Sequence, residues 1–157
     1  MLRQRNQGQA RHWVFDDARL LGRDARGVGR HSYPYLDIAT AIRRVQANGK
    51  PLDPAQIISE LPFGFWHQLV ARRQMFLWPD LAAAFAHAPS RSPVPVRDRL
   101  ARMRDLRNRI GHHYHIWSLD LDARWDDLLT VTGWIDPEWR AWVETNTGAP
   151  AALRVRP

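Results

Sequence analysis

The sequence predicts an all-α protein in which residues 1–157 form a single compact helical bundle. About six to seven helices are expected. Apolar residues recur three or four positions apart through most of the chain, and no segment alternates apolar and polar residues for long enough to form a strand. The dipeptide Asp-Pro also occurs twice at the start of such a stretch. Aspartate there accepts a free backbone amide, and proline has no amide to satisfy.

The N-terminal third is expected to hold two helices with a loop between them. The first helix covers residues 10–21. Residues 22–32 include three glycines and three arginines, which predicts a mobile loop. The second helix spans 35–47 and ends in the sequence Asn48-Gly49-Lys50-Pro51. Its apolar residues at helical spacing are Ile38, Ile42 and Val45.

Three shorter helices are expected in the middle of the chain. Asp53-Pro54 begins one that must end before Pro62. Another runs from residue 63 or 64 to 73, and a third from 78 to 86. Gly64 lies between aromatic residues, which predicts close packing of the backbone at that point.

The C-terminal part begins with the longest predicted helix, roughly 96–111, after a boundary marked by the prolines at 93 and 95. Residues 125–135 form an amphipathic stripe, and Asp136-Pro137 begins one more helix. The residues 146–157 contain a glycine and two prolines, so a loosely held tail is expected.

The composition restricts the class of protein. Eight tryptophans are expected to supply much of the core. The absence of cysteine excludes disulfides and thiolate metal sites. No apolar run approaches the length of a membrane span, and the first residues carry no apolar signal segment. We therefore expect a cytoplasmic location and no membrane partner.

The formal net charge is +7, which favours phosphate-bearing partners such as nucleic acid, or an acidic protein. The basic residues are arginines except for Lys50, and the planar arginine fork suits phosphate. A GC-rich genome that prefers arginine codons explains most of this skew. The charge thus supports nucleic acid as a partner without establishing it.

The candidate site lies at the end of the helix predicted for residues 96–111. The residues expected to face the core from this helix are Leu100, Met103, Leu106 and Ile110. Arg107 falls beside this stripe, and Asn108 shares a face with His112, four residues on. Gly111 is the expected C-cap, which places His112 and His113 at the helix end.

These residue types suit RNA cleavage without a metal. A histidine can transfer protons near neutral pH while the ribose 2′-OH attacks the adjacent phosphodiester. Arg107 can hold the phosphate and stabilise its charge in the transition state, and Asn108 can fix the histidine tautomer or contact the scissile phosphate. The same residue types also end ordinary helices, where they cap carbonyls, so the spacing alone leaves both interpretations open.

Two blocks of the chain resemble the signature of the Abi-like (abortive infection) proteins. One is an Arg-Asn-Arg-x-x-His-His block followed by a short apolar segment, here residues 106–113 and Ile116-Trp117. The other resembles the family's Glu-Leu-x-Phe-Gly block and lies at residues 59–66. Their order and separation also fit, and the resemblance extends over about residues 35–136.

Abi-like proteins belong to the all-helical HEPN superfamily, whose ribonuclease members carry Arg-x(4–6)-His. The resemblance implies that Arg107 and His112 are the catalytic pair and that Asn108 is their polar neighbour. His113 also satisfies the spacing, so the choice of histidine stays open. The resemblance further implies a homodimer with a composite site, RNA as the substrate and no cofactor. We expect Arg104 and Arg109 to contact the RNA.

Two single residues and one group of histidines are further candidates for a role at the site. Arg107-x4-His112-x-Tyr114 is similar to the pattern of HEPN toxins that are silenced when an antitoxin adenylylates the tyrosine, which makes Tyr114 a regulatory candidate. Glu60 is either a buried partner that orients Arg107 or a surface carboxylate. Consecutive histidines rarely converge on one ion, and no carboxylate sits at a complementary spacing, so no metal site is expected.

The sequence therefore predicts a metal-independent endoribonuclease that acts as a homodimer in a toxin or phage-defence setting, with an antitoxin protein as a further partner. One alternative is a non-catalytic HEPN domain that binds RNA or an acidic protein through its basic face. Another is a purely structural dimerisation module.

Overall fold

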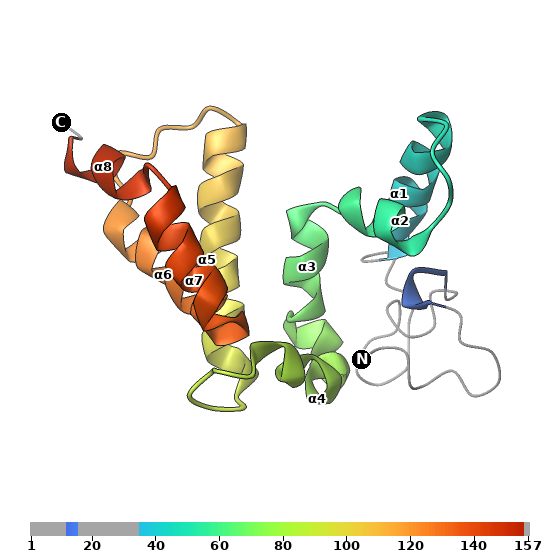
Figure 1. Ribbon diagram of the computed structural model, residues 1–157, viewed down its shortest axis with the longest axis horizontal. Coiled ribbons are helices and arrows are strands. Elements are labelled where there is room, and N and C mark those ends of the chain that lie inside the picture. The colour runs from blue at the N-terminus through green and yellow to red at the C-terminus, as the bar shows by residue number, and fades with distance from the viewer. Residues whose placement is uncertain (1–11, 16–34, 156–157) are drawn as a thin grey trace. The chain divides into compact units, whose positions relative to one another are not determined.

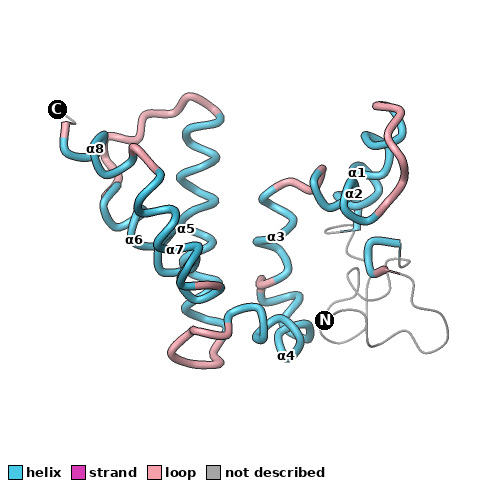
Figure 2. The backbone as a smooth tube through the Cα atoms, viewed as in Figure 1, coloured by secondary structure: helices cyan, strands magenta, loops and turns pink. Residues whose placement is uncertain are grey.

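The computed structural model describes residues 12–15 and 35–155, and every regular element within them is a helix (Figures 1 and 2). The all-α prediction is confirmed. The α-helices are α1 Tyr35–Ala47, α2 Pro54–Ser59, α3 Phe63–Leu69, α4 Trp78–Leu81, α5 Pro93–Gly111, α6 Leu121–Ile135, α7 Pro137–Asn146 and α8 Ala149–Arg154. The short 3-10 helices are η2 Trp13–Phe15, η3 Arg72–Leu77 and η4 Ala82–Phe85.

The predicted loop 22–32 lies outside the described residues, and only η2 is described of the helix predicted for 10–21. The chain divides into two compact units, residues 1–81 and 82–157. The prediction of one domain over the whole chain stays a prediction.

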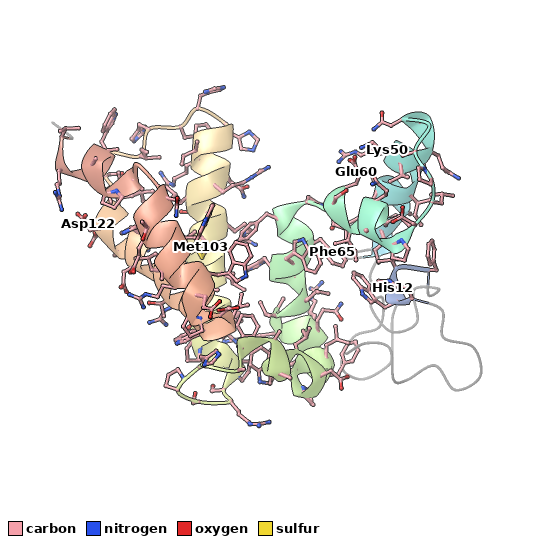
Figure 3. All side chains as sticks on the ribbon, viewed as in Figure 1. His12, Lys50, Glu60, Phe65, Met103 and Asp122 are labelled. Atoms are coloured by element: carbon pink, nitrogen blue, oxygen red, sulfur yellow. The ribbon has the colours of Figure 1, made fainter. Side chains whose placement is uncertain are left out.

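The first unit has an apolar core to which η2, α1, α2, α3 and η3 contribute. Phe65 of α3, labelled in Figure 3, is fully buried there. Trp13 stacks on Phe65 with 5.8 Å between ring centroids, and Trp66 meets both rings edge-on. The buried residues of this core cluster are Val14, Ile38, Ala41, Val45, Ile57, Leu61, Phe65, Leu69 and Leu77.

Local signals fixed two helix boundaries in this unit as expected. After α1, Gly49 has a φ of +64°. Its N–H donates to the carbonyl of Gln46, and the N–H of Lys50 donates to that of Val45, which together form a Schellman motif. The carboxylate of Asp53 accepts hydrogen bonds from two amides of the first turn of α2, at 2.8 and 3.0 Å. Both predictions are confirmed.

The region after α2 departs from the prediction in two ways. The helix expected to reach residue 73 ends at Leu69, and the chain continues as η3. Gly64 was expected to mark close backbone packing, and this is wrong, because a Cβ built there would meet nothing within 4 Å. Between α1 and α3, the side chain of Gln68 donates to Asp37 at 3.4 Å. Partial burial raises the pKa of this carboxyl group.

In the second unit α5 packs against α6, and α6 packs against α7 (Figure 1). The start of α5 corrects the prediction, since the prolines at 93 and 95 lie inside its first turn. The hydroxyl of Ser92 caps this turn by accepting from the N–H of Val94 at 3.3 Å. Proline is tolerated there because the first amides of a helix have no partner within the helix.

A buried ion-pair network, which we call the Asp127 cluster, joins α5 to α6. Asp127 is 4% exposed. Both of its oxygens accept from Arg102, the Nε bond being 2.7 Å and the Nη2 bond 2.5 Å. Arg99 and Arg124 approach the same carboxylate at 3.7 and 3.6 Å. The hydrogen bond to Asp127 raises the pKa of Arg102 further.

The apolar stripe on α5 was expected to face the core, but the Asp127 cluster provides polar contact between α5 and α6. Leu100, Met103 and Leu106 are only half-buried, and Ile110 is 54% exposed, so the prediction that Ile110 faces the core is wrong. Arg99 and Arg102 supply polar contacts between α5 and α6, and the guanidinium of Arg99 also lies 4.8 Å from the centre of the Trp134 ring. Part of the stripe is thereby left accessible.

The tryptophans were expected to supply much of the core, and this is also wrong. Of the eight, Trp78 alone is buried. Those that are exposed are Trp66, Trp117, Trp139 and Trp142. Aliphatic residues and Phe65 form the core in their place.

In the C-terminal residues, the start of α7 agrees with the prediction, and the conformation after α7 does not. The carboxylate of Asp136 accepts from the N–H of Glu138 at 2.8 Å and so caps α7 as predicted. The segment 146–157, expected to be a loose tail, contains α8, which packs against α6. Pro150 lies in the first turn of α8, where proline favours a helix start.

Gly133 allows α6 and α7 to approach closely. A Cβ at this position would lie 2.9 Å from Cδ of Arg140, whose guanidinium is held by Glu144. We expect Gly133→Ala to lower the free energy of unfolding by about 1 kcal/mol, because the overpacking outweighs the better helix propensity of alanine. Gly64→Ala is the matched control: it should raise stability by about 0.5–1 kcal/mol, since space is free there. Urea denaturation measures both changes in the free energy of unfolding. An equal increase in stability in the two variants would contradict the close approach of α6 and α7 at Gly133.

Candidate functional site

The candidate site is built at the C-terminus of α5. The helix ends at Gly111, with His112 as its C-cap. The N–H of His113 donates to the carbonyl of Ile110 at 3.1 Å, and the N–H of Tyr114 donates to that of Arg109 at 2.8 Å. These two bonds form the same Schellman motif that ends α1. They fix the backbone around the two histidines.

The residue in the left-handed position of this motif is His113, with a φ of +57°. In α1 the equivalent position is a glycine, Gly49. The prediction that Gly111 caps α5 is therefore wrong, since Gly111 is still helical. A side chain in this conformation costs about 1–2 kcal/mol, although histidine tolerates it better than most residues. Such local strain is often found at functional sites.

Replacing His113 with glycine should relieve this strain. We expect His113→Gly to raise the free energy of unfolding by up to about 1 kcal/mol. His115→Gly is the matched control, because His115 has no positive φ and glycine there only adds freedom to the unfolded chain. That control should lose about 0.4–1 kcal/mol in urea denaturation. A loss of similar size in His113→Gly would show that position 113 is unstrained.

Arg107 and Asn108 form a pair on the surface of the last turns of α5. The Nη1 of Arg107 donates to Oδ1 of Asn108 at 3.2 Å. The same Nη1 lies 3.9 Å from where a Cβ would be on Gly111. This is an ordinary van der Waals distance, so a Cβ at position 111 would not displace the guanidinium. Asn108 orients Arg107, an arrangement that the sequence did not reveal.

His112 and Tyr114 form a second pair at the same helix end. Their ring centroids are 5.9 Å apart, and the ring planes are inclined by 35°. Arg107, His112, His113 and Tyr114 are all exposed. A guanidinium and an imidazole are therefore accessible at one helix terminus, where they can meet a ligand in solution.

The other predicted site residues have separate environments. Arg109 is paired with Asp105, one turn earlier, with 3.4 Å between Nε and Oδ2. Arg104 is exposed on α5. Glu60 lies in the first unit, where its carboxylate approaches Lys50 to 3.9 Å, and both are labelled in Figure 3. A contact between Glu60 and Arg107 stays a prediction.

The part of the chain that the structure describes gives two findings on metals and membranes. No group of three or more histidine and carboxylate side chains gathers there in a way that could hold a metal ion. No helix among the same residues combines the length and the apolar character needed to cross a membrane.

Two features that bear on the site were not predicted from the sequence. Asp127 is buried, whereas its neighbour Asp126 is exposed, and no local pattern in the sequence distinguishes the two. Trp117 was noted only as part of an apolar segment, and it proves to be 72% exposed. Its exposure follows from the loop conformation, which the spacing of residues does not encode.

Comparison of the chain with protein-family models, with curated proteins and with solved structures finds no match.

Proposed function

We propose that the chain is a metal-independent endoribonuclease of the HEPN type. The observation that supports this best is the joint exposure of Arg107 and His112 at the fixed end of α5. The resemblance to Abi-like proteins assigns the catalytic roles to these same two residues. Asn108 holds the guanidinium by a hydrogen bond and so belongs to the site as a positioning residue.

In the proposed reaction the ribose 2′-OH attacks the neighbouring phosphorus, and the bond to the 5′ oxygen breaks. His112 transfers protons, either from the attacking hydroxyl or to the leaving oxygen. Arg107 stabilises the charge that accumulates on the phosphate oxygens, because a guanidinium donates two parallel hydrogen bonds. The products are a 2′,3′-cyclic phosphate and a 5′ hydroxyl.

The proposal includes a homodimer with a composite site. One histidine cannot be base and acid at the same moment, and a second copy would supply the other imidazole. Ile110 lies one helical turn from Arg107 and is exposed, so it offers apolar surface to that copy. We place the activity in a toxin or phage-defence setting, in which an antitoxin protein modifies the exposed Tyr114.

The test is to incubate the purified chain with RNA in the presence of EDTA. We expect the RNA to be cut. RNA that is retained but never cut would replace the nuclease with an RNA-binding domain. The absence of any salt-dependent affinity for RNA would leave a structural dimerisation module or a binder of acidic proteins.

A further inference from the structure

A loop joins α5 to α6 and directly follows the candidate site (Figure 2). Two of its aromatic side chains are exposed. Tyr114 is 65% exposed and Trp117 is 72% exposed. Two large aromatic side chains exposed three residues apart in one loop offer surface to a ligand, because water is displaced from them favourably on contact.

Local hydrogen bonds give this loop a defined shape. The Schellman motif fixes Tyr114 by its bond to Arg109. The N–H of Leu119 donates to the carbonyl of Ile116 at 3.0 Å and closes a turn with Trp117 at its second position. Asp120 then caps α6 by accepting from the N–H of Ala123. Hydrogen bonds therefore fix the backbone conformation around both aromatic residues.

The charges in the segment that carries the two rings indicate what kind of ligand it suits. Residues 104–117 carry three arginines, three histidines and a single acidic residue, Asp105, which is paired with Arg109. Arginine side chains interleaved with aromatic rings suit a polymer that has both phosphates and flat bases. An acidic peptide would use the arginines but has no groups that require the rings.

We propose that Tyr114 and Trp117 are a base-stacking platform that selects single-stranded RNA for the site. Bases within a duplex stack on one another, so their faces are not accessible to the protein. The bases of a single strand can stack on aromatic side chains. Because the ring centroid of Tyr114 lies 5.9 Å from that of His112, a base stacked on Tyr114 would hold its own phosphate close to the imidazole of His112. This proposal rests on the proposed function, since it names the substrate of the same site.

The experiment uses wild-type chain and a short fluorescent 2′-O-methyl oligonucleotide, single-stranded or as a duplex, in an anisotropy titration. Methylation removes the attacking hydroxyl, so binding is measured without cleavage. We expect the single strand to bind more tightly than the duplex. Tyr114→Ala and Trp117→Ala should each weaken its binding about tenfold. Tyr114→Phe and Trp117→Phe should retain it, because they keep a ring. Trp142→Ala is the matched control, since Trp142 is 57% exposed on α7 and should not affect binding.

Each outcome has a distinct meaning. Equal binding of duplex and single strand, or wild-type affinity in both alanine variants, would overturn the platform even if unmodified RNA is cut. Weakened binding in those variants together with intact unmodified RNA would leave the platform standing and refute the nuclease. No affinity for either oligonucleotide would overturn both. Circular dichroism of each variant shows that it is folded.

Discussion

Loss of RNA cleavage by about 10²–10⁴-fold is the expected result of replacing His112 with alanine, which is the usual contribution of a proton-transferring side chain. Arg107→Ala should cost about 10²–10³-fold, because a group that stabilises charge in the transition state is removed. Both side chains are exposed, so neither variant should alter the fold. The measurement is the rate of cleavage of a labelled RNA at saturating enzyme.

Matched variants distinguish the proposed catalytic roles from a general effect of positive charge and from the effect of changing any exposed side chain. Arg107→Lys keeps the positive charge but loses the planar fork, and its activity should fall between those of wild type and Arg107→Ala. His87→Ala and Arg91→Ala remove exposed side chains that precede α5 and should cut at the wild-type rate. Full activity in His112→Ala together with loss in His113→Ala would transfer the catalytic role to the neighbouring histidine.

The second large effect is expected at the Asp127 cluster. Asp127→Ala should lower the free energy of unfolding by about 3 kcal/mol, because it leaves cationic side chains next to one another without their carboxylate. The loss lies at the lower end of the range for a broken buried pair, since Arg102 is partly exposed and can turn toward water. Urea denaturation measures the change.

Asp126→Ala is the control for this prediction. Asp126 is the exposed neighbour of Asp127 on α6, and its removal should change stability by less than about 0.5 kcal/mol. A loss of that small size in Asp127→Ala would show that the Asp127 cluster does not hold α5 against α6. Since α5 carries Arg107 and His112, a folded Asp127→Ala protein should also cut RNA more slowly than wild type.

Features that depend on a few neighbouring residues were predictable from the sequence. The caps at Asp53 and Asp136 follow from a carboxylate beside a proline, and the end of α1 follows from Gly49. The helical class follows from apolar spacing over the whole chain. Each of these depends on backbone hydrogen bonds made within a few residues, so the local sequence contains the information.

Features that depend on contacts between helices were not predictable. Apolar spacing placed Ile110 in the core, but α5 meets α6 through the Asp127 cluster. Gly111 looked like a cap, but the hydrogen bonds of the helix end put His113 in the left-handed position. The site residues were predicted from their chemistry together with the resemblance to Abi-like proteins, whereas the bond between Arg107 and Asn108 required coordinates.

The chemical form of the RNA ends tests the central claim most directly. The purified chain is incubated with a defined RNA in EDTA, and the new ends are identified by mass spectrometry. Attack by the 2′-OH, with His112 and Arg107 in the roles proposed, must leave a 2′,3′-cyclic phosphate and a 5′ hydroxyl. New ends that carry a 3′ hydroxyl and a 5′ phosphate, or cleavage that appears only when a divalent metal is added, would contradict the account.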